Sequence, residues 1–161
     1  MPKQITKTVY EYHELSDRAK DRARNWWIDL DFEWYGDVYE DAKSTADIKI
    51  EGFDIGRGQS CDIKFLTDAP TTLRRILSEH GDTTGTWKVA KEYEKDVLRV
   101  YEDESAEDEA QTVVANFKKA LEAEFLTLLR DEHEYRTGDE YIAEVMQANE
   151  YTFDENGRRD G

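Results

Sequence analysis

The sequence predicts an α+β fold, in which a small antiparallel sheet of about three or four strands is packed by about five or six helices. Segments with the two-residue period of strands occur at both ends of the chain and in its middle, and segments with helical period separate them. The chain has 161 residues and only 2 prolines, which suits one ordinary domain. We therefore expect residues 1–161 to form a single domain, in the order strand, two helices, two strands, four helices, strand.

The first elements are a strand and a pair of helices. Residues 4–12 are rich in β-branched and aromatic side chains that partly alternate with polar ones, as expected of a strand. Ser16 is placed to cap a helix in which alanines, tryptophans and a leucine recur at helical spacing. The pattern extends to Ala46, but Asp31 and Gly36 favour a break, so we expect two consecutive helices.

A β-hairpin and another helix follow. From residue 48 to residue 65 the apolar residues alternate, and Gly56 and Gly58 provide permissive backbone at the predicted turn. Pro70 suits the first turn of the next helix, and Gly81 would end that helix in the left-handed conformation.

Three further helices and a closing strand complete the predicted fold. Residues 87–101 outline a helix with charged sides, and the clearest helical period, over residues 110–129, predicts a long helix covering one face of the sheet. Thr137 and Glu140 have the spacing of a capping box that opens a short helix. Residues 150–153 are predicted to form the last strand.

The charge balance restricts the function. The chain holds 38 acidic and 22 basic residues, a formal net charge of −16, which argues against binding nucleic acid or anionic membrane through a basic face. Residues 102–161 hold 18 of the acids and 6 of the bases. The densest group is an acidic connection near 102–109, formed by Glu102, Asp103, Glu104, Glu107, Asp108 and Glu109. We expect this group to start a helix, where carboxylates complement the helix dipole. We also expect it to bind a partner, and the competing explanation for the negative charge is that it only increases solubility.

The sequence contains no catalytic or metal-binding motif. His13, His80 and His133 have no partner residue at a useful spacing, and the single Cys61 excludes a disulfide framework or a cysteine-based zinc site. The GRGQS segment at 56–60 lacks the ending of a phosphate-binding loop. We therefore predict no catalytic residues, no cofactor and no metal.

The aromatic residues crowd into one segment, in which Trp26, Trp27, Trp34 and Tyr35 fall within ten positions. A platform for stacking bases lies in a basic groove, whereas acids follow this segment, so we predict core packing with one or two rings exposed to a partner protein. The rings proposed for that role are Trp34 and Tyr35. The remaining partner-binding candidates are acids near the end of the long helix, namely Asp131, Glu132 and Glu134.

No stretch near the start of the sequence has the length and apolar character of a signal peptide, and no uncharged run approaches the length of a bilayer span. We therefore expect a cytoplasmic protein that makes no membrane contact.

Four segments carry a family resemblance: VYEYHELSDRAKDRARNWW at 9–27, FEWYGDVYEDAK at 32–43, GFDIGRGQSCDIKF at 52–65 and EYRTGDEYIAEVMQANEYTFDENGRR at 134–159. Together they resemble an acidic family of phage and prophage proteins, often labelled "antitoxin of toxin-antitoxin stability system". The resemblance covers most of the chain, and the region from about 82 to 112 matches least. It implies a small accessory gene on a mobile element.

This resemblance and the charge lead to one functional hypothesis. The protein would be a non-enzymatic, phage-type inhibitor of the anti-CRISPR or anti-restriction type. It would bind a host nucleic-acid-handling defence machine through an acidic surface, as a DNA mimic does. Its partner would be a host protein with a basic nucleic-acid-binding surface, in the cytoplasm of a bacterial host, with no direct contact to nucleic acid. The alternatives are an antitoxin that neutralises a cognate toxin by direct binding and, less favoured, an enzyme with a carboxylate site. Homodimerisation stays open.

Overall fold

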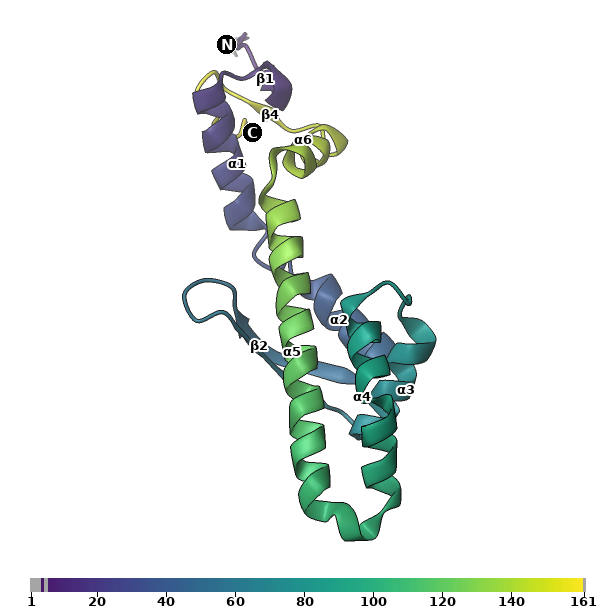
Figure 1. The fold of residues 1–161 in the computed structure, drawn as a ribbon. Helices are drawn as coiled ribbons and strands as arrows, with labels where there is room; N and C mark the ends of the chain where they lie inside the picture. Colours follow the sequence, from purple (N-terminus) through teal and green to yellow (C-terminus); the bar gives the residue numbers. More distant parts are fainter. Residues whose placement is uncertain (1–3, 5, 161) are drawn as a thin grey trace. The chain divides into compact units, whose positions relative to one another are not determined.

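The structure is a computed structural model that describes residue 4 and residues 6–160. Its elements follow one another in the predicted order (Figure 1). Two short 3-10 turns are added to them. The chain divides into two compact units: unit 1 holds the chain up to Trp34 and from Glu132 onward, and unit 2 holds Tyr35–Asp131. A single domain over residues 1–161 remains a prediction.

Unit 1 is built from two segments that are distant in sequence. Its elements are β1 (Tyr10–Glu11), η1 (Tyr12–Glu14), α1 (Asp17–Leu30), the last residues of α5 (Glu107–Thr137), α6 (Asp139–Ala148) and β4 (Thr152–Phe153). β1 and β4 pair antiparallel, with Tyr10 opposite Phe153. This pairing joins the early and late parts of the chain.

The core of unit 1 is aromatic. Trp26 of α1 meets the rings of Tyr151 and Phe153 edge-on, at centroid distances of 5.4 and 6.1 Å. Gly157 is required in the loop after β4, because its φ is +83° and a Cβ there would lie 2.0 Å from the carbonyl oxygen of Ala19. The rings and the glycine therefore fix the last loop against α1.

Unit 2 is continuous in sequence. Its elements are α2 (Gly36–Ala46), β2 (Ile48–Asp54), β3 (Ser60–Phe65), α3 (Ala69–Glu79), α4 (Gly85–Glu102), η2 (Glu104–Ala106) and most of α5. The predicted hairpin is confirmed, with Ile50 opposite Ile63 and an irregularity between Ile50 and Gly52. The long helix α5 packs on β3, where Phe117 stacks on Phe65 with ring centroids 5.8 Å apart.

Several predicted helix starts are confirmed. The Ser16 hydroxyl accepts a hydrogen bond from the Ala19 amide at 3.2 Å and caps α1. Pro70 lies in the first turn of α3, whose cap is Asp68. These signals are local in sequence, and the local backbone follows them.

The prediction of one sheet with about three or four strands is wrong, because the described residues form two separate sheets of two strands each. In unit 2, the outward Ile63 amide on β3 donates to the Glu122 carboxylate at 3.0 Å. In unit 1, Phe153 is bridged to Arg159 as well as to Tyr10. At these two positions the strand edge is therefore already occupied.

The predicted terminal strands shorten to two residues each. Of the predicted strand 4–12, Ile5 lies outside the described residues, and Tyr12 already belongs to the 3-10 turn η1. At the other end, Glu150 has a positive φ of 55°, so a strand cannot begin there. Local β propensity predicted the positions of these strands but not their lengths.

Three predicted turn and cap signals are also corrected. Thr137 does not cap α6, because α5 continues to Thr137 and its hydroxyl donates to the His133 carbonyl at 2.8 Å. α3 ends at His80 in extended backbone rather than at Gly81 in the left-handed region. In the hairpin loop the positive φ falls on Gln59 and not on a glycine.

Among the described residues, no helix is both long enough and apolar enough to cross a bilayer.

Candidate functional site

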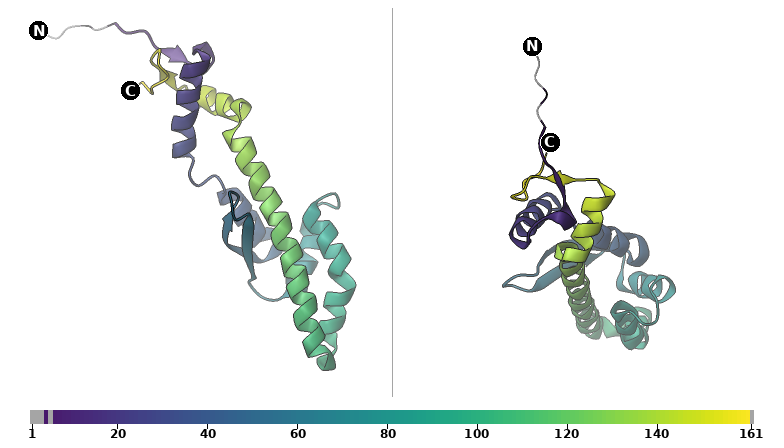
Figure 2. Two further views of the ribbon diagram at one scale, coloured as in Figure 1. Left: turned by 60° about the vertical axis from the view of Figure 1, so that its left-hand side comes forward. Right: turned by 90° about the horizontal axis from the view of Figure 1, so that it is seen from above.

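An acidic turn joins α4 to α5 at one end of unit 2, as the left-hand view of Figure 2 shows. We define the acidic tip by its six exposed carboxylate side chains, Glu102, Asp103, Glu104, Glu107, Asp108 and Glu109. No basic residue interrupts the sequence from 101 to 110. The tip is therefore a concentrated negative charge in contact with water.

The turn is held by one of its own acids. Asp103 Oδ1 accepts hydrogen bonds from the Ser105 amide at 3.0 Å and the Ser105 hydroxyl at 2.6 Å. These bonds hold the pKa of Asp103 below its ordinary value, so its carboxylate stays charged. Ala106, only 8% exposed, is the apolar residue that anchors the turn.

One cation, Arg99, lies beside the tip. Its guanidinium binds both oxygens of Glu109, at 2.5 and 3.2 Å, and approaches Asp96 at 3.6 Å. The hydrogen bonds from Arg99 lower the pKa of Glu109. Within residues 4 and 6–160, no hydrogen bond or ion pair engages the carboxylates of the other four tip acids, Glu102, Glu104, Glu107 and Asp108.

The acids predicted near the end of α5 are not part of the tip. Asp131 is exposed, but it lies 22 residues beyond Glu109 on α5, about 33 Å along a helix that rises about 1.5 Å per residue. Glu132 accepts a hydrogen bond from Arg136 Nε at 2.7 Å, and Glu134 is exposed. The structure therefore separates Asp131 from the tip and engages Glu132 in an ion pair.

The two predicted aromatic anchors are half-buried and belong to different units. In unit 1, Trp34 packs edge-on against the His133 ring, with centroids 5.0 Å apart. In unit 2, Tyr35 packs against Tyr39 at 4.9 Å and Phe53 at 5.4 Å. Both side chains therefore pack against other aromatic rings. The acids close to them in sequence gave no indication of these ring contacts.

The thiol of Cys61 is not activated as a nucleophile. Cys61 is buried in β3, and burial, together with the charges of Glu122 and Asp62, raises the pKa of its thiol to about 11. The thiol is therefore protonated and unreactive at neutral pH. His80, the histidine of unit 2, is hydrogen-bonded to threonine hydroxyls through both ring nitrogens.

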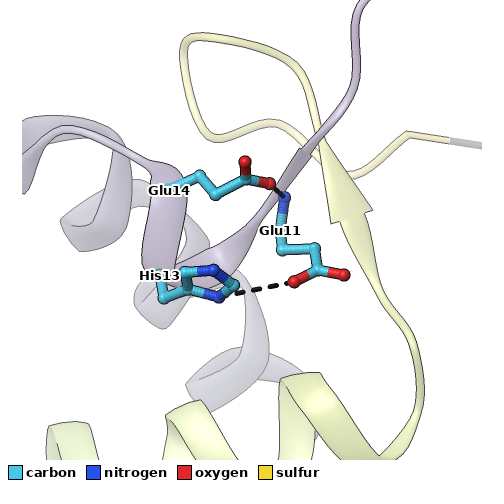
Figure 3. Close-up of side chains that lie close together, drawn as sticks. All are labelled: Glu11, His13 and Glu14. Carbon is cyan, nitrogen blue, oxygen red and sulfur yellow. Dashed lines mark hydrogen bonds and ion pairs between the residues drawn. The ribbon is translucent and has the colours of Figure 1, made fainter.

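Unit 1 holds one cluster of ligand-type side chains that the sequence motifs did not predict. Glu11, His13 and Glu14 place donor atoms within 4.8 Å of one another around η1 (Figure 3). His13 Nδ1 lies 3.4 Å from the Glu11 carboxylate, and Glu14 Oε1 accepts a hydrogen bond from the Glu11 amide at 2.8 Å. The signal in the sequence is the spacing Glu-x-His-Glu across a tight turn.

A cavity of about 470 Å³ adjoins this cluster. Glu11 and His13 line it from one side, and Met146 and Tyr151 line it from α6 and the segment after it. A mixed imidazole and carboxylate set suits zinc or a similar divalent ion. All three residues are exposed, Glu14 already accepts the bond from the Glu11 amide, and Glu11 and His13 lie against each other, so we assign no metal here.

No match to this chain was found among protein families, curated proteins or solved structures.

Proposed function

We propose that this protein is a non-enzymatic binding protein that uses the acidic tip to occupy a basic, nucleic-acid-binding surface of another protein and thereby inhibits it. The target class is a host defence machine of the restriction or CRISPR type. The family resemblance supports this proposal through the context it implies, a phage accessory gene that acts in the cytoplasm of a bacterial host.

The observation that carries the proposal is the availability of the tip carboxylates. Four of the six accept no hydrogen bond from the described part of the chain, and all six face water. Carboxylates that are free of internal partners can accept hydrogen bonds from lysine and arginine on a partner. They also steer association, because complementary charge accelerates encounter in a salt-dependent way.

The rigidity of the tip adds to its suitability. Asp103 fixes the turn through Ser105, and Arg99 fixes the start of α5 through Glu109. The four available acids are therefore presented on helical backbone or next to it. Preorganised charge loses less conformational entropy on binding than charge on a flexible tail.

Affinity capture from a bacterial lysate, followed by reconstitution with the purified captured protein, tests the proposal. We expect a nucleic-acid-binding complex that is released at high salt and displaced by competing duplex DNA. Inhibition of that complex's own activity on DNA is the functional measurement.

Two variants make this test specific. The tip variant carries Glu102→Gln, Glu104→Gln, Glu107→Gln and Asp108→Asn, and it should lose binding. The control variant makes the same change in charge at four other exposed acids of unit 2, and it should keep binding: Glu51→Gln, Asp62→Asn, Asp82→Asn and Glu92→Gln.

Three results would contradict the proposal. Binding by the tip variant that equals wild type would show that the tip is not the interface. Capture of a small toxin in place of a nucleic-acid-binding complex would favour the antitoxin hypothesis. Turnover of nucleotides that depends on a carboxylate pair would favour an enzyme.

A further inference from the structure

A half-buried histidine of unit 2 is hydrogen-bonded through both nitrogens of its ring. His80 is the C-cap of α3, where its amide donates to the Ile76 carbonyl at 2.9 Å. Its ring Nε2 lies 2.8 Å from the Thr45 hydroxyl of α2, and its ring Nδ1 lies 2.6 Å from the Thr86 hydroxyl of α4. One imidazole thus links the two helices that pack against α3.

The hydrogen-bond network assigns the tautomer of this ring. The Thr45 hydroxyl donates its only hydrogen to the Asp41 carbonyl at 2.5 Å. It can therefore only accept from His80, so Nε2 carries the proton. Nδ1 is then an acceptor for the Thr86 hydroxyl, and every hydrogen in the chain of bonds has an acceptor when the ring is neutral.

A second proton would disturb this arrangement. It would bind at Nδ1 and turn that nitrogen into a donor toward Thr86, whose own hydrogen would then need another acceptor. The hydroxyl oxygen of Thr84 could accept that hydrogen, but it lies at the long distance of 3.4 Å from the Thr86 hydroxyl oxygen. Thr84 already donates to the Gly81 carbonyl and caps α4.

The charged groups around the ring do not offset this cost. Asp41 of α2 and Glu79 of α3 favour the protonated ring, but both are exposed to water. α4 contributes the neutral hydroxyl of Thr86, which is 3% exposed. Burial outweighs the two carboxylates and lowers the pKa of His80 below 6.5.

We propose that His80 is an acid-sensitive clamp, which holds α2, α3 and α4 together while its imidazole is neutral and loosens them when it binds a proton. The direction follows from linkage. The stabilisation is complete well above pH 6.5, where folded and unfolded chains both hold a neutral ring. It is lost as the pH falls below that value, because the unfolded chain then binds the proton more readily.

The experiment compares urea unfolding of the full chain, followed by circular dichroism, across the range in which His80 titrates. The test variant is His80→Gln, whose amide can donate to Thr45 and accept from Thr86 without titrating. The matched control is His13→Gln, because the His13 side chain is 73% exposed. All three proteins carry the same carboxylates, so the differences between their pH dependences report chiefly on each histidine.

Between about pH 7.5 and about pH 5, wild type should lose about threefold or more in its folding equilibrium constant relative to His80→Gln. His13→Gln should follow wild type. Hydrogen exchange, corrected for the intrinsic pH dependence, should show protection falling in α2 and in the first turns of α4.

A pH dependence in His80→Gln equal to that of wild type would overturn the proposal. If His80→Gln does not fold, nuclear magnetic resonance of the His80 ring protons in folded wild type gives the midpoint of its titration, and that midpoint tests the proposal. A midpoint at or above 6.5 would exclude the clamp, and a midpoint below it would support the clamp.

Discussion

Each unit holds one group of carboxylates, and the two groups are used in opposite ways. In unit 1 three acids serve the fold: Asp139 accepts from Tyr12 and Arg24, and Asp31 and Glu132 share Arg136. In unit 2 most acids of the tip face water without a partner among the described residues. A count of negative charges therefore does not identify a binding surface, because the same residue type stabilises one unit and remains available in the other.

Removing the shared cation of unit 1 should have the largest effect on stability. The Arg136 side chain is 20% exposed and reaches Glu132 at 2.7 Å, Asp31 at 3.5 Å and the Tyr141 hydroxyl at 3.1 Å. Arg136→Gln leaves two largely buried carboxylates close together, so we expect a loss of about 2–3 kcal/mol, measured by urea unfolding.

Arg136→Lys is the matched control, because it keeps the charge but not the planar fork. It should lose less stability than Arg136→Gln. If Arg136→Gln lowers the free energy of unfolding by less than about 1 kcal/mol, these contacts contribute no more than ordinary surface ion pairs. The contrast between the two units would then be weaker.

An intermediate effect is expected at Asp139. Its carboxylate accepts a hydrogen bond from the hydroxyl of Tyr12, a residue only 4% exposed, and another from Arg24 Nη1 at 3.0 Å. Asp139→Ala removes the acceptor of a buried hydroxyl, so we expect a loss of about 1–2 kcal/mol at neutral pH. Asp139→Asn, which keeps an acceptor oxygen, should lose less.

The contribution of Asp139 should also depend on pH. The hydrogen bond from Tyr12, and then the contact with Arg24, lower the pKa of Asp139 below 3.8. Its stabilisation is therefore present above that value and is lost as the pH falls through the folded pKa. Unfolding curves of wild type and Asp139→Ala should converge in acid, and a constant gap would contradict an ionised Asp139.

The tip should show the smallest effect on stability. In the tip variant, four exposed carboxylates without internal partners become neutral, so we expect a change within about 0.5 kcal/mol by urea unfolding. The control variant should behave alike, which makes partner binding the property that separates them. A large loss of stability in the tip variant would mean that the tip serves the fold, as the acids of unit 1 do.

The local elements were predictable because their signals lie within a few residues. Ser16 and Pro70 mark helix starts that the structure confirms, and the hairpin was visible in the alternation of its isoleucines. The acidic tip was predictable for the same reason, since a run of acids in sequence stays together in space across a short turn.

Pairings between distant residues were not predictable. Nothing near Ile63 indicates that its amide binds Glu122, and nothing near Asp31 indicates Arg136. These contacts decide which edges of the sheets are closed and which acids are engaged. The sequence pattern alone could therefore not divide one sheet into two, nor distinguish Glu132 from Asp131.

The discontinuity of unit 1 has a consequence for synthesis. A ribosome makes residues 35–131 before it makes α6 and β4, so the second unit is complete in sequence while the first still lacks Ile142, Met146 and Phe153 of its core. Domains usually fold in the order in which they emerge. In this chain we expect the nascent α1 to remain unpacked until Tyr151 and Phe153 have been made, because these rings pack against Trp26 and Trp27.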